Sequence, residues 1–67
     1  MLQGTVSEFD ARDGVGLIES DDGKIVLFNT RNLQWDDPDA LTVGVRVLFH
    51  SLNGELGPHA DLVRICE

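Results

Sequence analysis

Carboxylates are the commonest side chains in this sequence that could bind a metal ion or exchange protons. Three of them, Asp36, Asp37 and Asp39, stand close together, and clustered carboxylates are typical ligands of Ca²⁺. The glycine and the distal glutamate that complete an EF-hand loop do not follow them. A solvated acidic loop is therefore the favoured interpretation of this cluster.

The other candidate ligands lack the spacing of a known site. His50, His59 and Cys66 have no recognised zinc spacing, and no motif pairs a nucleophile with a base. A chain of 67 residues builds one core of modest size, which leaves little room for a deep enclosed pocket. We therefore expect a single domain over residues 1–67 that is not an enzyme and uses neither a metal nor another cofactor.

The charge balance disfavours one class of ligand. Twelve acidic residues stand against five basic ones, which gives a net charge of −7. The basic residues are scattered along the chain at Arg12, Lys24, Arg31, Arg46 and Arg64. Binding of a phosphate backbone by bulk electrostatics is therefore not expected.

The cysteine content and the hydropathy indicate where the protein works. Cys66 is the only cysteine, so no internal disulfide can form. No apolar run is long enough to span a bilayer, and no charged-then-apolar leader opens the sequence. We expect a soluble, cytoplasmic protein that does not associate with membranes.

Residues 13–30 are the stretch around which the other elements are expected to assemble. Two short apolar runs, Val15–Ile18 and Ile25–Phe28, flank a polar stretch. The pair Asp22-Gly23 in that stretch is a hairpin turn signal. The pattern predicts two antiparallel strands joined by a tight turn.

Successive side chains of a strand point to opposite faces, so each strand of this hairpin has an inward and an outward set. If Ile18, Val26 and Phe28 point into a core, Gly16 shares the inward face. The outward set then forms an aliphatic patch of Val15, Leu17 and Leu27. Scattered exposed aliphatic residues and a protein-contact surface are both open interpretations of this patch.

The remaining sequence predicts three more strands. Residues 2–10 form a strand with a bulge near Ser7 and Glu8, because Val6 and Phe9 break strict alternation. A turn at 11–14, a long surface loop at 30–42, a strand at 43–50, turn signals at 53–54 and 57–58, and a last strand at 59–65 complete the chain. Five short strands without a helix predict an all-β, closed, antiparallel barrel. Its expected core is Val6, Ile18, Val26, Phe28, Val47, Phe49 and Val63.

Four stretches match the motifs of one known family. Gly4–Asp10 stands in the place of Gly-Lys-Val-Lys-Trp-Phe-Asn, and Asp13–Ile18 in the place of Lys-Gly-Phe-Gly-Phe-Ile. Val26–Thr30 aligns with Val-Phe-Val-His-Phe, and Gly57–Ala60 with Gly-Pro-x-Ala. Over its whole length the chain resembles the bacterial cold-shock proteins, which are small OB-type barrels. It looks like an acidic, divergent member.

The resemblance implies that the protein takes part in gene expression and binds single-stranded RNA and DNA. Such proteins stack bases on aromatic rings set among basic residues. Here Glu8 replaces a tryptophan and Asp13 a lysine, and aliphatic or polar residues replace most of the other rings, so that Phe9 alone remains. The resemblance assigns the altered binding face to Glu8, Phe9, Asp13, Val15, Leu17, Leu27, Asn29 and Thr30.

Two functions follow from these observations. The first is single-stranded nucleic-acid binding that is strongly weakened. The alternative is a barrel that no longer binds nucleic acid and contacts a protein partner or a second copy through Val15, Leu17 and Leu27. Trp35 either adds a contact from the loop or covers one edge of the barrel.

Overall fold

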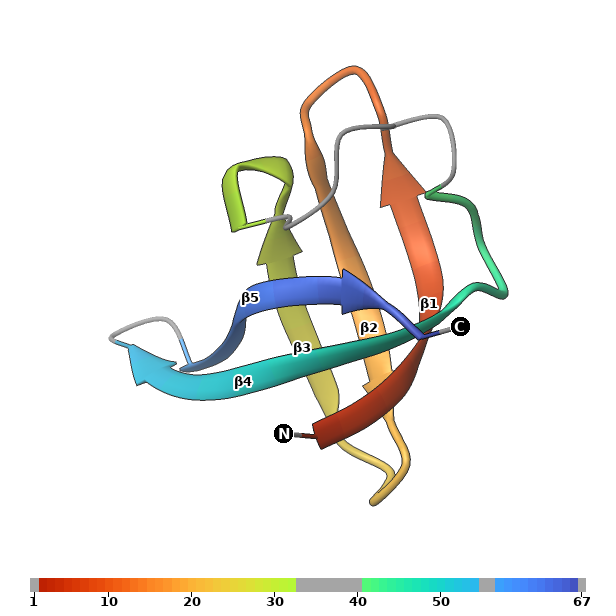
Figure 1. Cartoon of the computed structure of the whole chain (residues 1–67). Coiled ribbons are helices and arrows are strands. Elements are labelled where there is room, and N and C mark those ends of the chain that lie inside the picture. The colour runs from red at the N-terminus through yellow and green to blue at the C-terminus, as the bar shows by residue number, and fades with distance from the viewer. Residues whose placement is uncertain (1, 33–40, 55–56, 67) are drawn as a thin grey trace.

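The strands of the computed structural model close into a barrel in the order β1-β2-β3-β5-β4 (Figure 1). The structure describes residues 2–32, 41–54 and 57–66. The strands are β1 (Leu2–Asp10), β2 (Val15–Ser20), β3 (Ile25–Asn29), β4 (Arg46–Gly54) and β5 (Gly57–Ile65), and a short 3₁₀ helix, η1 (Thr30–Asn32), follows β3. The prediction of a five-stranded all-β barrel is confirmed.

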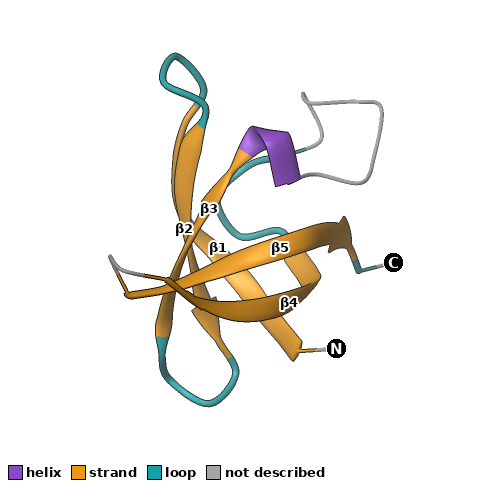
Figure 2. Ribbon diagram, turned by 90° about the vertical axis from the view of Figure 1, so that its left-hand side faces the viewer, coloured by secondary structure: helices purple, strands orange, loops and turns teal. Residues whose placement is uncertain are grey.

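One pair of strands departs from the predicted antiparallel arrangement. β3 and β5 pair in parallel at Leu27 and His59, whereas the other neighbours in the barrel are antiparallel. The reason is geometric: each antiparallel step reverses the strand direction, and a ring of five strands cannot close after five reversals. In Figure 2, β2 and β3 rise steeply in the left half of the molecule, and β4 and β5 run across it toward the right.

The seven predicted core residues are all buried. Buried apolar side chains fill the barrel: Val6, Ile18, Val26, Phe28, Leu41, Val47, Phe49, Ala60 and Val63. Full burial of a side chain of this size contributes roughly 1.5–3 kcal/mol. Leu41 and Ala60 were not predicted. Leu41 lies at the end of the segment predicted as a surface loop, yet it is only 3% exposed.

The other boundaries differ by a few residues for local reasons. The strand predicted from residue 43 begins at Arg46, because Val45 N–H donates to Thr42 O (3.2 Å) and Gly44 has a φ of 99°. The predicted turn residues at 53–54 and 57–58 pair with one another across β4 and β5. Of the predicted loop, residues 30–32 form η1 and residues 33–40 lie outside the described residues.

The predicted bulge in β1 is present and sets the direction of the side chains beyond it. The pairing of β1 with β2 shifts between Val6 and Glu8, and Ser7 Oγ donates to Leu17 O (3.3 Å). The extra residue reverses the alternation, so that Val6 and Phe9 both face the core while Glu8 is exposed. The bulge therefore places Glu8 on the outer face, opposite Leu17.

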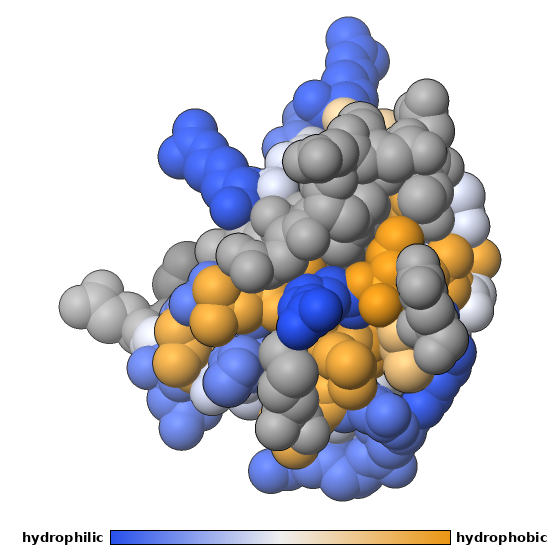
Figure 3. Space-filling view, viewed as in Figure 1, coloured by the Kyte–Doolittle hydropathy of each residue, from blue (hydrophilic) through white to orange (hydrophobic). Residues whose placement is uncertain are grey.

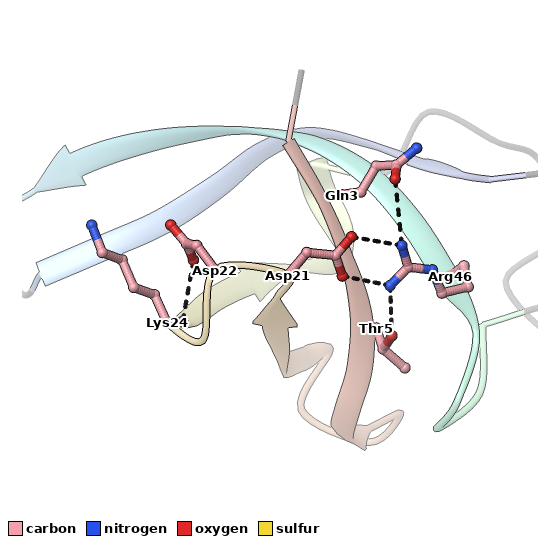
Figure 4. A network of polar contacts seen from close by, with 6 residues as sticks. All are labelled: Gln3, Thr5, Asp21, Asp22, Lys24 and Arg46. Atoms are coloured by element: carbon pink, nitrogen blue, oxygen red, sulfur yellow. Dashed lines mark hydrogen bonds and ion pairs between the residues drawn. The ribbon is translucent and has the colours of Figure 1, made fainter.

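An exposed arginine joins three parts of the barrel (Figure 4). Arg46 on β4 donates to both carboxylate oxygens of Asp21, at 2.7 and 2.8 Å. It also donates to Thr5 Oγ1 (3.0 Å) and Gln3 Oε1 (3.4 Å) on β1. The hydrogen bonds from Arg46 lower the pKa of Asp21 below its ordinary value.

We predict that this ion pair makes the free energy of unfolding depend on pH in the acidic range. Because the folded-state pKa of Asp21 is lowered, its contribution is complete above the unfolded-state pKa and is lost as the pH falls through the folded-state pKa. Urea unfolding between about pH 5 and pH 2 should therefore show a steeper loss for the wild type than for Asp21→Asn. Asp13→Asn, which removes another exposed carboxylate, is the control. Parallel curves for the wild type and Asp21→Asn would contradict this expectation.

Leu62 has a strained backbone conformation. Its φ is 51°, in the left-handed region, at the point where the register between β4 and β5 shifts. A β-carbon in this region costs about 1–2 kcal/mol, and asparagine tolerates the region better than leucine. We predict that Leu62→Asn raises the free energy of unfolding by up to about 1 kcal/mol. Leu2→Asn, at a position of similar exposure but negative φ, should not raise the free energy of unfolding. Equal changes in the two variants would disprove the strain at Leu62.

Candidate nucleic-acid interface

β1, β2 and β3 arrange the predicted face residues in cross-strand rows. In one row Leu17 lies between Glu8 and Leu27, and in the next Val15 lies between Asp10 and Asn29. The row between them, Phe9, Gly16 and Phe28, faces the core. Since neighbouring side chains on one face of a sheet lie close enough to interact, the two outer rows form a continuous surface.

The outer rows, together with Phe9 and Gly16 of the row between them, line a shallow hollow of about 240 Å³. Its lining consists of Glu8, Phe9, Asp10, Val15, Gly16, Leu17 and Leu27. Five of the eight predicted face residues are therefore brought together, whereas Asp13, Asn29 and Thr30 do not line it. Asp10 was not predicted. Its position two residues after Glu8, on the same face of a strand, is the signal that could have identified it. We call the space lined by these seven residues the apolar hollow.

The predicted residues outside the hollow are Asp13 on the turn after β1, Asn29 at the end of β3 and Thr30 at the start of η1. Gly14 N–H donates to Asp10 O (2.8 Å), and Thr30 N–H donates to Gly14 O (2.8 Å), which ties the 11–14 turn to η1. Asp10 Oδ1 accepts hydrogen bonds from the backbone of Arg12 (3.0 Å) and Asp13 (3.2 Å). The carboxylate of Asp10 thus shapes the turn, and Asp13 is exposed on it.

Asn29 has a comparable local role. Its Oδ1 accepts a hydrogen bond from Arg31 N–H (2.9 Å) at the start of η1. An asparagine side chain that bonds the backbone two residues later is a common way to begin a turn. The side chain of Asn29 is therefore engaged in holding the connection after β3.

Phe9, the remaining ring of the altered face, packs on the core. Its ring lies parallel to that of Phe28, with centroids 6.1 Å apart and 10° between the planes. Phe9 is half-buried, so one face of the ring is already occupied. An isolated ring in this position offers less stacking surface than a set of adjacent exposed rings does.

Gly16 makes the packing of these rings possible. A β-carbon added to Gly16 would lie 2.6 Å from two ring atoms of Phe28 and 2.6 Å from Glu8 O. A side chain at this position therefore cannot be accommodated without moving both β1 and the ring of Phe28. Gly16 holds β1, β2 and Phe28 in close contact beneath the apolar hollow.

The charge of the hollow is negative. Glu8 and Asp10 line it, and among the described residues of its lining none is basic. The carboxylate of Glu8 is exposed, as is that of Asp13 on the adjacent turn. The surface thus offers aliphatic contact and hydrogen-bond acceptors, and its lining side chains supply no donor to a phosphate.

The remaining candidate site residues of the sequence are Trp35, the acidic cluster, the two histidines and Cys66. Trp35, Asp36, Asp37 and Asp39 lie outside the described residues. Within the described ranges, no three His, Cys, Asp or Glu side chains are grouped as a metal site requires. Over the same ranges, no helix has the length and apolar character that crossing a membrane would need. Cys66 is a free thiol.

The barrel and its motif-bearing strands define the class of the protein. A family model described as the 'Cold-shock' DNA-binding domain matches residues 2–66. The chain belongs to this family, which confirms the resemblance found in the sequence.

Named relatives agree with this assignment. The chain is 40% identical to Cold shock-like protein CspF of Escherichia coli (strain K12) over 60 residues, which cover 88% of the chain and 86% of the relative. It is 37% identical to Cold shock-like protein CspC of Bacillus cereus over 59 residues, covering 88% and 91% of the two chains. A Major cold shock protein of Streptococcus pyogenes is 35% identical over 60 residues, with 90% of each chain covered.

A solved structure supports the fold. The chain superposes on "drosophila Unr CSD456" with a TM-score of 0.80 over 98% of its length, at 16% sequence identity. The match covers 26% of that longer chain. At this identity the likeness shows the shared barrel, and the site residues stay predictions.

We predict that Gly16→Ala destabilises the barrel by about 1–3 kcal/mol, the usual cost of overpacking a core. In a Phe28→Leu background the same substitution should cost less, because part of the clash is with the ring. Urea unfolding of the four variants of this cycle measures the coupling. A Gly16→Ala protein as stable as the wild type would contradict the close approach.

Proposed function

We propose that this protein takes part in gene expression as a cold-shock domain. Its face on β1, β2 and β3 binds single-stranded DNA or RNA only weakly. The observation that carries the proposal is the lining of the apolar hollow. Val15, Leu17 and Leu27 occupy the positions at which the family motifs have rings, and Glu8 occupies that of a tryptophan. A cytoplasmic location is part of the same proposal.

The size of the lost stacking energy supports weak binding. Each stack of a base on a ring is worth roughly 1–3 kcal/mol. Losing about four or five stacks removes on the order of 5–10 kcal/mol if the energies add, although such energies seldom add fully. A micromolar complex has only about 8 kcal/mol of binding energy in total. The aliphatic side chains cannot replace this contribution.

Electrostatic repulsion also weakens the binding of nucleic acid. The lining carries Glu8 and Asp10, and the whole chain has a net charge of −7. A nucleic-acid strand carries a negative charge at each phosphate, so its approach to this face is opposed by like charge. The repulsion is strongest at low ionic strength, where screening is weakest.

Restoring the ring-bearing residues tests the proposal. We predict that the wild type binds a heptamer of thymidine with a Kd of order millimolar. A variant with six of the family residues returned should gain several kcal/mol. It carries Glu8→Trp, Asp13→Lys, Val15→Phe, Leu17→Phe, Leu27→Phe and Asn29→His. Calorimetry or polarisation of a labelled heptamer measures both affinities.

A control variant with Leu2→Phe and Val43→Phe adds rings at exposed positions outside the lining, and it should bind no better than the wild type. Micromolar binding by the wild type would overturn the proposal. A folded, restored variant that still fails to bind would show that the backbone of the face differs from that of a nucleic-acid-binding barrel.

A further inference from the structure

The apolar hollow combines a floor and a rim of different chemistry. Phe9, Val15, Leu17 and Leu27 give an apolar floor, and the carboxylates of Glu8 and Asp10 stand beside it. Its volume of about 240 Å³ is below the roughly 300–1,000 Å³ of pockets that enclose small molecules. A space of this size suits one or two side chains from a protein segment.

The apolar surface continues along β3 beyond the hollow. Leu27 is 44% exposed, and Ile25, two residues earlier on the same face of the strand, is 50% exposed. Exposed leucines occur elsewhere too, and the β4–β5 side shows separate apolar areas among polar ones (Figure 3). Exposure alone therefore does not mark a site. The hollow is distinguished by contiguous apolar residues with carboxylates at the edge.

The charge of the hollow distinguishes between its possible occupants. A nucleic-acid strand is a polyanion, and a second copy of the chain carries the same net charge of −7. Both meet repulsion at Glu8 and Asp10, with exposed Asp13 and Glu19 on the same three-stranded part of the surface. Arg12 and Arg31 are exposed on the connections and do not line the hollow. A cationic partner is attracted, both in long-range steering and in contact.

We propose that the apolar hollow docks a protein segment that presents an aliphatic or aromatic side chain next to lysine or arginine. The apolar side chain packs on Val15, Leu17 and Leu27. Glu8 is the main partner of the cation, because Asp10 Oδ1 already accepts two backbone hydrogen bonds within its own turn. This inference goes beyond nucleic-acid binding and does not depend on it.

A synthetic amphipathic helical peptide of leucine and lysine is the probe, and a leucine and glutamate peptide of equal length is its counterpart. Each is titrated into ¹⁵N-labelled protein, and amide shifts map the site. The Leu/Lys peptide should shift amides of β1, β2 and β3 around the hollow, with an affinity that falls as salt is added. The Leu/Glu peptide should not bind. Failure of the Leu/Lys peptide to bind, or equal binding of the two peptides, would overturn the proposal.

Two matched pairs of variants separate docking from general attraction to an acidic protein. Leu27→Lys and Leu2→Lys add the same charge at residues that are 44% and 43% exposed. Leu27→Lys should weaken binding of the Leu/Lys peptide about tenfold or more, and Leu2→Lys less than about twofold. Glu8→Gln should weaken it about threefold, and Asp22→Asn, on the β2–β3 turn, much less. Circular dichroism verifies that each variant is folded.

Equal losses within each pair would show that attraction to the whole chain explains the binding, and would overturn the proposal. Sedimentation tests the second copy as occupant: a wild-type dimer that Leu27→Lys dissociates and Leu2→Lys does not would also overturn it. Tighter binding of a thymidine heptamer than of the Leu/Lys peptide at the same amides would assign the face to nucleic acid instead. Weak heptamer binding together with weak peptide binding would reject docking and leave the proposed function intact.

Discussion

The contact of the Phe28 ring with the backbone of Gly16 is the constraint on which the face of this barrel depends. Because a β-carbon at Gly16 would lie 2.6 Å from the ring, only a glycine at this position lets the Phe28 ring pack inward against β2. Strand alternation then fixes the neighbours: Val15, Leu17 and Leu27 must point outward. The bulge at Ser7 brings Glu8 onto the same outer surface. The composition of the candidate face is thus tied to the packing of the core beneath it.

The scaffold and the surface of this cold-shock domain carry different information. Inward residues, turn glycines and the bulge keep the barrel of the family, and the Arg46–Asp21 pair adds a tie between β1, β4 and the β2–β3 turn on its outside. The outward positions of β1, β2 and β3 instead hold aliphatic and acidic residues. Since outward residues contribute little to the core, their chemistry can change while the fold is retained. The family fold is thus kept while the chemistry of this outer face differs from that of the family motifs.

The sequence predicted the buried strands well because alternation reports directly on burial. Val6, Ile18, Val26 and Phe28 lie where the pattern put them, and the broken alternation between Val6 and Phe9 located the bulge. Leu41 was missed because the residues before it have no periodicity and it was counted with them, although the fold returns it to the core. The parallel contact of Leu27 with His59 follows from closing a ring of five strands, which no local pattern contains. Asp10 joined the hollow because it lies two residues after Glu8 on the same face of β1, opposite Val15.

We infer that this face combines an exposed apolar surface with a negative potential. Paramagnetic relaxation of its amide protons by soluble nitroxides of opposite charge measures that potential residue by residue. We expect stronger relaxation by the cationic nitroxide than by the anionic one at residues 8–10, 15–17 and 27. The difference between the two probes should shrink as salt is added. Equal relaxation by the two probes, or stronger relaxation by the anionic probe at these residues, would contradict it.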